Sequence, residues 1–209
     1  MQSPFCFAGM VNCFEGREGH LCVEMAPLME EDALVIFNPT ELPVKEMYKL
    51  MTSTVVPRPI AWVSSQSPEG VLNAAPFSFF TVVSESPAML AITLNQRQGT
   101  QKDTLRNIEA TGEFVINIVT EAVAQKMVQT SGDYPPDIDE FDVAGLTPVP
   151  STVVKPPRIG ESPVNYECRL ERIIAFGEPA SYLIVGRVEL LHVADELVFE
   201  GTKIDVAKL

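Results

Sequence analysis

Residues 164–170, with the sequence VNYECRL, alternate apolar and polar side chains without a break. A side-chain period of two is typical of a strand with one face in the core and the other in solvent. The apolar segment 180–193 follows after a turn that contains Gly177 and Pro179. The two segments predict a long antiparallel hairpin near the end of the chain.

Other strands and helices are expected upstream of this hairpin. The strand candidates are residues 58–65, 88–94 and 113–119. The turn SPEG at 67–70 predicts that the chain returns antiparallel from Val71. Helices are expected over 44–51 after Pro43, over 103–111 and from Thr120 to about 129.

The second of these helices carries the clearest boundary signals. Asp103 is expected to cap its start, Leu105 and Ile108 to form its apolar face, and Gly112 to end it. Strands outnumber helices and follow one another in hairpins. This order predicts a mainly β fold, an antiparallel barrel or sandwich with inserted helices.

Length and charge exclude several classes of protein. The 209 residues suit one domain with appendages, and 28 acidic against 15 basic residues give a net charge of −13. That charge repels nucleic-acid phosphates, so we expect no nucleic-acid partner. The sequence holds no apolar run of about 18 residues and no basic start of a signal peptide. We expect a cytoplasmic protein without membrane association.

The first 33 residues differ from the rest of the chain, because they show no clear period. We assign 1–33 to an N-terminal extension of unknown role and 34–209 to the domain, with 34–37 as a strand or lead-in. No C-x-x-C spacing occurs, which favours a reduced, loosely structured tail. A metal-binding module built on Cys13, His20 and Cys22 is an unrelated alternative.

The usual catalytic motifs are missing from the sequence. There is no G-x-G-x-x-G, P-loop, G-x-S-x-G or H-E-x-x-H pattern, and the two histidines, His20 and His192, lie far apart. His192 ends an apolar segment and is expected to be structural or exposed, and Trp62 is expected to be a core aromatic. We therefore assign no catalytic side chain and no metal ligand, as is typical when a cofactor carries the chemistry.

Three segments carry residues suited to a flat, phosphate-bearing ligand. In VPRPIAWVSS (56–65), Arg58 lies between two prolines that stiffen the backbone. In NAAPFSFF (73–80), small residues let a ring approach the backbone. In NQRQGTQKDT (95–104), two cations precede a predicted helix start, which attracts anions. Taken singly, they are also compatible with a solvated strand start, a bulged core strand and an ordinary capped helix.

Taken together and in order, these segments resemble the flavin reductase-like FMN-binding family, in its flavoredoxin-type branch. The similarity lies in PRPIAWVSS, NAAPFSFF and KDTLRNIEATGEFVINIV, and continues in DEFDVAGLTPVPS and VKPPRIGESPVNYECRL. It covers residues 38–194 approximately. The resemblance implies an antiparallel split β-barrel and a homodimer, with FMN near the subunit interface.

The resemblance also implies a set of cofactor-binding residues. Contacts to the flavin or its phosphate are expected from Arg58, Ser64 and Ser65. The isoalloxazine is expected against Asn73, Ala75, Pro76 and Ser78. The phosphate end is expected at Lys102, Asp103 and Thr104, together with Arg97. Asn117 is a weaker candidate, and a C-terminal tail found in relatives does not follow Leu209 in this sequence.

The activity implied by the resemblance is an NAD(P)H-dependent flavin oxidoreductase that transfers hydride to FMN. Two alternatives stay open, because the sequence shows no defined NAD(P)H pocket. One is a flavoredoxin-like electron carrier that exchanges electrons with a redox partner protein. The other is a non-catalytic FMN-binding protein.

Overall fold

The computed structural model describes residues 11–16, 19–24, 34–96 and 100–209. The chain divides into two compact units, Met1–Val56 and Pro57–Leu209. None of the helices in the described ranges is long and apolar enough to cross a membrane. The predicted boundary between residues 33 and 34 stays a prediction.

In the described residues of the first unit there are three elements, which are β1 (Val11–Gly16), β2 (Gly19–Glu24) and α1 (Val44–Thr54). The strands form an antiparallel hairpin within the segment for which the sequence predicted a loose tail, and their backbone register places Cys13 opposite Cys22. The side chains of the hypothetical metal module lie outside the described part. Helix α1 begins at the predicted residue and ends three residues later than expected, while residues 34–37 form an irregular lead-in.

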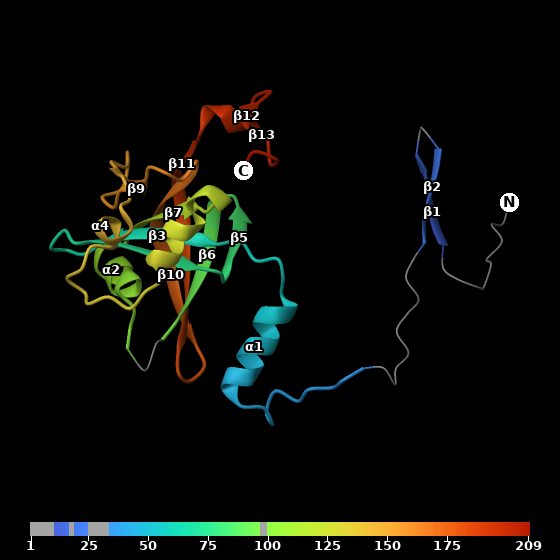
Figure 1. Ribbon diagram of the computed structural model, residues 1–209, viewed down its shortest axis with the longest axis horizontal. Coiled ribbons are helices and arrows are strands. Elements are labelled where there is room, and N and C mark those ends of the chain that lie inside the picture. The colour runs from blue at the N-terminus through green and yellow to red at the C-terminus, as the bar shows by residue number, and fades with distance from the viewer. Residues whose placement is uncertain (1–10, 17–18, 25–33, 97–99) are drawn as a thin grey trace. The chain divides into compact units, whose positions relative to one another are not determined.

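The second unit is built on a seven-stranded sheet with the order β4-β3-β7-β10-β11-β6-β5 (Figure 1). Every neighbouring pair is antiparallel. Its strands are β3 (Ala61–Gln66), β4 (Leu72–Phe77), β5 (Phe80–Glu85), β6 (Ala88–Asn95), β7 (Glu113–Ile118), β10 (Val164–Phe176) and β11 (Ser181–Val193). All the predicted strands of this unit are confirmed within a few residues, and β5 is an additional strand.

Among the described residues, five helical segments and four very short strands complete this unit. They are α2 (Asp103–Thr111), η2 (Glu121–Val123), α3 (Ala124–Gln129), α4 (Glu140–Ala144), η3 (Asp195–Leu197), β8 (Pro148–Val149), β9 (Arg158–Ile159), β12 (Val198–Phe199) and β13 (Lys203–Ile204). Helix α2 has the predicted bounds and ends at Gly112, whose φ of 70° is left-handed. The predicted cap was wrong by one residue, because Lys102 occupies the N-cap and Asp103 begins the helix.

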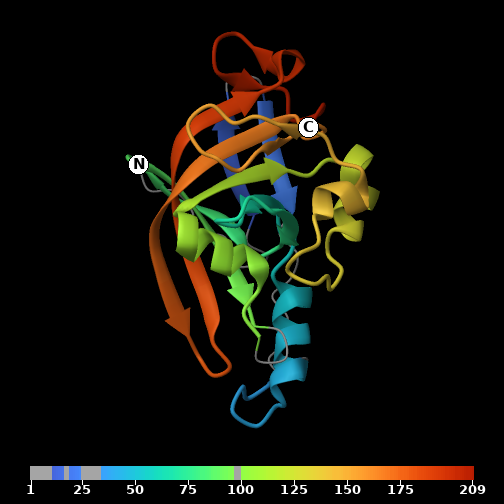
Figure 2. The same ribbon diagram turned by 90° about the vertical axis from the view of Figure 1, so that its left-hand side faces the viewer.

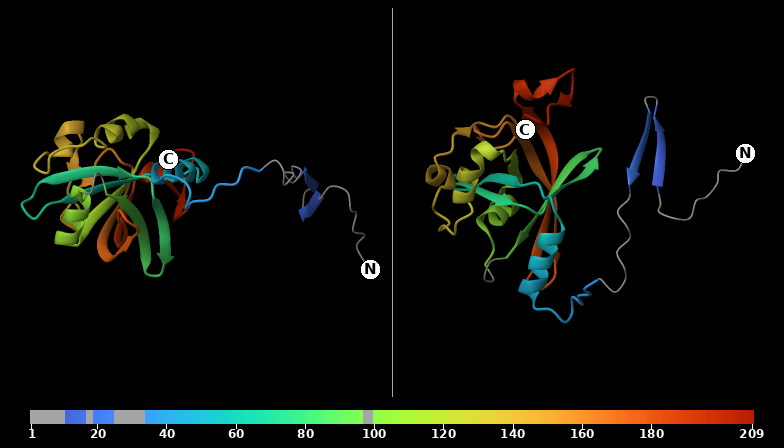
Figure 3. Two further views of the ribbon diagram at one scale, coloured as in Figure 1. Left: turned by 90° about the horizontal axis from the view of Figure 1, so that it is seen from below. Right: turned by 45° about the vertical axis from the view of Figure 1, so that its right-hand side comes forward.

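The β3–β4 hairpin separates two hydrophobic cores. On one face, Leu105 and Ile108 of α2 pack with Val63, as the apolar face predicted. On the other face, Trp62 packs with Phe141 of α4 and with residues of α3. Figure 3 (left) shows the teal hairpin with α2 on one side and α3 and α4 on the other. Strand β4 is an edge of the sheet, so both helical layers end beside it.

The long hairpin β10–β11 runs through the middle of the sheet, as Figure 2 shows. Two of the three polar residues of VNYECRL, Asn165 and Glu167, do not face solvent, contrary to the interpretation of this segment as a half-buried strand, whereas Arg169 is exposed as expected. Asn165 is 4% exposed and Glu167 is fully buried. The cause is the irregular segment 150–160, whose backbone covers this face and hydrogen-bonds to its side chains.

Glu167 anchors that segment to the sheet. Its carboxylate accepts hydrogen bonds from the backbone N–H groups of Thr152 (2.7 Å), Val153 (2.6 Å) and Val154 (3.3 Å). His192 Nε2 lies 2.6 Å from Glu167 Oε1, which confirms a structural place for this histidine. Burial acts to raise the pKa of Glu167, but the backbone N–H groups and His192 outweigh it, and the pKa lies below its usual range.

We expect Glu167→Gln to lower the free energy of unfolding by roughly 2–4 kcal/mol, because an amide cannot accept all of these hydrogen bonds. The lowered pKa means that the carboxylate stabilises the fold above its unfolded pKa. The difference between the proteins should therefore shrink as the pH falls through the folded pKa. Urea denaturation at several pH values measures both effects. Glu171→Gln, at an exposed site on the same strand, is the control, and equal losses in the two variants would contradict the anchor.

Candidate functional site

A cavity of about 330 Å³ lies where strand β4 meets the start of α2, the start of α4 and the loop after α3. Its size is at the lower end of the range for ligand pockets. The lining residues are Asn73, Ala75, Pro76, Thr100, Gln101, Lys102, Asp103, Thr104, Arg106, Thr130, Ser131, Gly132, Asp133, Tyr134, Pro136 and Glu140. All of them belong to the unit Pro57–Leu209.

The side chain of Asn73 joins the walls of this cavity. Its Nδ2 donates to Glu140 Oε1 at 2.8 Å. Its Oδ1 accepts from Thr104 Oγ1 at 2.8 Å and from Ser65 Oγ at 3.2 Å. One buried amide therefore connects β4 with α4, α2 and β3.

The first turn of α2 supplies the positive wall. Lys102 occupies the N-cap position, but its side chain has no acceptor and makes no capping hydrogen bond. The backbone N–H groups at the helix start therefore keep their affinity for anions. The Lys102 ammonium lies 5.3 Å from the centre of the Phe77 ring. Asp103 and Arg106 form an ion pair within the same turn. The arrangement suits an anionic group such as a phosphate.

The loop 130–136 contributes another wall of the cavity and is fixed at its start. Thr130 Oγ1 accepts from Trp62 Nε1 at 2.9 Å and donates to Met127 O at 2.8 Å, so the loop starts on the core aromatic that the sequence predicted. The Tyr134 ring covers Gly132, where an added Cβ would meet the ring at 2.8 Å. A side chain at this glycine would displace Tyr134 from the cavity wall.

Glu140 is the least satisfied group of the site. The residue is 6% exposed, and its Oε2 is buried without a hydrogen-bond partner among the residues that the structure describes. Burial raises the pKa of Glu140 above its usual range, although the bond from Asn73 and nearby backbone N–H groups oppose this shift. A carboxyl group in this state can hold a proton or accept a donor from a ligand.

Six predicted cofactor-binding residues line the cavity, namely Asn73, Ala75, Pro76, Lys102, Asp103 and Thr104. The other described candidates, Arg58, Ser64, Ser65 and Ser78, do not belong to its lining, and Arg97 lies outside the described residues. None of these assignments to a flavin is tested by the fold, and they stay predictions.

Two of the three predicted serines, Ser64 and Ser65, support the site without lining the cavity. Ser64 Oγ donates to Pro157 O at 2.6 Å, and Ser65 Oγ donates to Asn73. Asn117 is buried and holds the backbone in place, since it donates to Trp62 O at 2.8 Å and accepts from Ile159 N at 3.0 Å. All three side chains make hydrogen bonds that stabilise the fold, and none of them lines the cavity.

The loop 130–136 and Glu140 were not among the residues predicted for the site, because no strand or helix pattern was recognised between residues 130 and 140. The signal for α4 was present in DEFDVA (139–144). Asp139 accepts from the Phe141 N–H at 2.8 Å, an N-cap in front of the apolar residues of a short helix. Nothing in that pattern marked Glu140 as buried.

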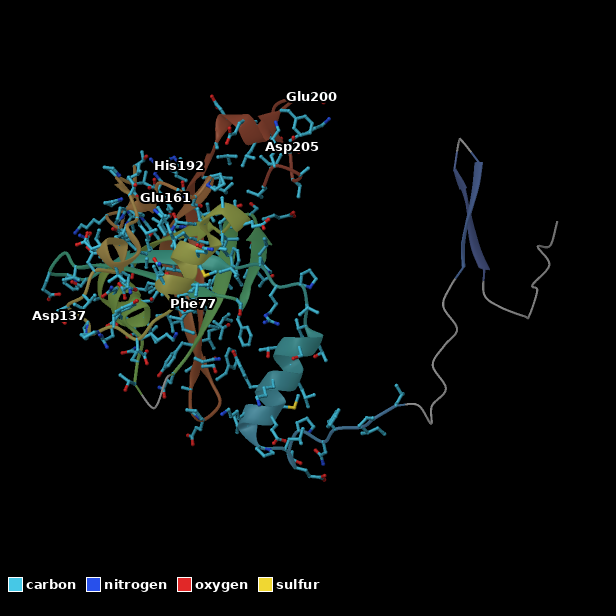
Figure 4. All side chains as sticks on the ribbon, in the orientation of Figure 1. Phe77, Asp137, Glu161, His192, Glu200 and Asp205 are labelled. Carbon is cyan, nitrogen blue, oxygen red and sulfur yellow. The ribbon has the colours of Figure 1, made fainter. Side chains whose placement is uncertain are left out.

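A second cavity, of about 710 Å³, lies near the start of β10 and the end of β11. His192 and Glu161 line it, and Figure 4 labels both of them, well apart from Phe77. Glu161 is paired with Lys126 at 2.9 Å, and His192 is paired with Glu167. Arg158 and Glu196 also line this cavity, and Arg158 Nε is buried without a hydrogen-bond partner among the described residues. None of the predicted cofactor-binding residues lines it, which favours the first cavity as the functional site.

Comparison with known proteins places this fold in a family. A family model described as "Flavin reductase like domain" matches residues 51–205. The chain belongs to the flavin reductase like family. The resemblance noted in the sequence is thereby confirmed. The predicted split β-barrel fold is also confirmed, because the chain has the fold of a solved structure that is described as having a split barrel domain.

Several flavin reductase like relatives are similar over most of their length. A protein of Aquifex aeolicus is 44% identical over 163 residues, which are 78% of this chain and 82% of the relative. The structure of nitrilotriacetate monooxygenase component B from Bacillus cereus is 39% identical, with a TM-score of 0.82 and coverage of 85% and 89%. That of 2-nitrobenzoate 2-nitroreductase from Pseudomonas fluorescens is 34% identical, with a TM-score of 0.72 and coverage of 84% and 81%. This membership supports a flavin-related oxidoreductase function.

We expect Asn73→Ala to destabilise this flavin reductase like protein by roughly 2–4 kcal/mol, because three buried polar groups lose a partner at once. Urea denaturation measures the change. Gln66→Ala, which removes a single hydrogen bond at an exposed turn, should cost less than about 1 kcal/mol. A loss at Asn73 no larger than that at Gln66 would show that the amide does not join the walls.

We expect Glu140→Gln to increase stability at neutral pH and to leave it unchanged in acid. The folded pKa of Glu140 is raised, so its neutral form stabilises the fold below the unfolded pKa and this contribution is lost as the pH rises through the folded pKa. Glutamine keeps the acceptor for Asn73 and carries no charge. Thermal unfolding across the pH range measures the effect, and a variant less stable than the parent at neutral pH would contradict it.

Proposed function

We propose that this protein binds FMN in the cavity beside β4 and works as an NAD(P)H-dependent flavin oxidoreductase. The observation that carries the proposal is the joining of predicted residues from two distant segments, 73–76 and 102–104, in one cavity at a helix start. Family membership supports the flavin as the ligand class. Names of the similar proteins, a monooxygenase component and a nitroreductase, agree with redox chemistry.

The residues present fit such a cofactor at its phosphate end. Backbone N–H groups at the start of α2, the Lys102 ammonium and the Thr104 hydroxyl form a cradle for an anion. Ala75 and Pro76 present small side chains to the cavity, so a ring system can approach the β4 backbone. Asn73 and Glu140 line the same cavity and provide further polar groups for the ligand.

In this proposal the bound flavin supplies the capacity to accept a hydride from NAD(P)H. The protein orients the ligand and excludes water from its buried side. None of the described side chains in the cavity has to act as an acid or base in hydride transfer, in agreement with the absence of catalytic motifs. The fixed loop 130–136 keeps its wall rigid through the bond between Thr130 and Trp62.

Several finer parts of the proposal rest on the resemblance alone. They are FMN in preference to FAD, the homodimer, a redox partner protein and a cytoplasmic location. The choice between NADH and NADPH belongs with them.

Purified protein titrated with FMN should quench flavin fluorescence at a ratio of one flavin per chain. Lys102→Gln should weaken the affinity about tenfold, equivalent to about 1.4 kcal/mol, because one charged contact to the phosphate is lost. Lys155→Gln, at an exposed lysine outside the cavity, should leave the affinity unchanged.

The FMN-loaded protein should then lose its visible absorbance when NADH or NADPH is added without oxygen. Rapid bleaching supports the oxidoreductase. A loaded protein that resists both nucleotides but accepts electrons from a chemical reductant would instead support the electron carrier. Failure to bind FMN at all would overturn the proposed site.

A further inference from the structure

We propose that the Glu140 carboxyl takes up one proton when a phosphate-bearing flavin binds. The site therefore favours ligands whose binding is accompanied by protonation of Glu140. The inference rests on the proposed function, because it takes the phosphate to lie at the start of α2. The proton comes from solvent and is held on the Glu140 carboxyl. No covalent bond of the ligand is formed or broken.

The geometry of the carboxyl group is the starting point. Glu140 lines the cavity, is 6% exposed, and has one oxygen held by Asn73. The other oxygen, Oε2, is buried and has no hydrogen-bond partner within the described residues. A buried polar atom without a partner costs free energy, and a ligand oxygen that accepts a hydrogen bond from a protonated Oε2 removes that cost.

Asn73 also fixes which oxygen is available. Its Oδ1 already accepts from Thr104 and Ser65, so its amide must present Nδ2 to Glu140. An Nδ2 donor selects an acceptor, so Oε1 bears no proton. Oε2 is therefore the atom that gains a proton and donates to the ligand.

The charges around the cavity make a second negative charge unfavourable. The cations of the lining are Lys102 and Arg106, and Arg106 is paired with Asp103. In the facing loop, Asp133 adds a negative charge and Tyr134 a phenol. The cavity therefore offers little cationic surplus for a phosphate dianion.

The remaining elements add negative charge near Glu140. Its own segment carries Asp139, which raises the pKa of Glu140, and the exposed Asp142, which does not contribute to that shift. Strand β4 carries no titratable side chain, and Lys126 of α3 is engaged by Glu161 and Gly145. A phosphate that enters this site and an ionised Glu140 repel each other in a medium of low dielectric constant. Protonation of Glu140 replaces that repulsion by a hydrogen bond.

The experiment compares FMN with riboflavin, which lacks the phosphate, at a series of pH values. Flavin fluorescence quenching gives the affinity of the parent protein and of Glu140→Gln, which keeps the acceptor for Asn73 and offers a donor without a proton. Asp142→Asn removes an exposed carboxylate of the same helix and is the matched control. Calorimetry of FMN binding in two buffers of different ionisation enthalpy counts the protons taken up.

We expect the affinity of the parent protein for FMN to fall by up to tenfold per pH unit, between the pKa of the free carboxyl and its higher value in the complex. Glu140→Gln should lose this fall and retain only the dependence caused by the phosphate, whose own second pKa is about 6. Asp142→Asn should follow the parent. Riboflavin should show little pH dependence with any of the three proteins.

Calorimetry of the parent should show uptake approaching one proton, and uptake should drop in Glu140→Gln. Equal pH dependence of FMN binding in these two proteins would overturn the inference and leave the proposed function in place. Absence of proton uptake by the parent would do the same, even if the variant did not fold. Absence of FMN binding by the parent at every pH would overturn the proposed function, and the inference with it.

Discussion

The buried Asn73 amide is the contact on which the candidate site depends. An amide has two donors and an acceptor with two lone pairs, and burial makes each unsatisfied one costly. Asn73 uses three of these four, with partners on α4, α2 and β3. The two helices pack on opposite faces of the β3–β4 hairpin, so a side chain at the sheet edge is well placed to reach both.

The edge position of β4 explains why a cavity forms there. An interior strand has neighbours on both sides, whereas an edge strand leaves its outer backbone groups and the ends of both helical layers beside an open space. The helix start on one layer and the loop 130–136 on the other become the walls. Groups that can bind an anion and small side chains that can accommodate a flat ring therefore line the same cavity, although the sequence contains no catalytic motif.

The sequence predicted what local periodicity and capping control. The strands, α2 with Gly112 at its end, and the residues at 73–76 and 102–104 follow from short-range patterns and from the family resemblance. The burial of Glu167 could not be predicted in this way, because it depends on a segment some 15 residues away that covers an otherwise solvent-facing strand. Glu140 escaped for the same reason, since its environment is created by Asn73, which is 67 residues distant.

The acidic composition bears on how such a site can select its ligand. With a net charge of −13, the chain as a whole repels anions, and much of the cationic charge at the cavity is paired with carboxylates. Attraction by net charge is therefore weak, and it is screened by salt. Backbone N–H groups of α2 and oriented side-chain donors act at short range and depend on geometry. Discrimination should consequently arise from the placement of hydrogen bonds around the ligand, which the Asn73 network holds fixed, more than from the electrostatic field of the protein.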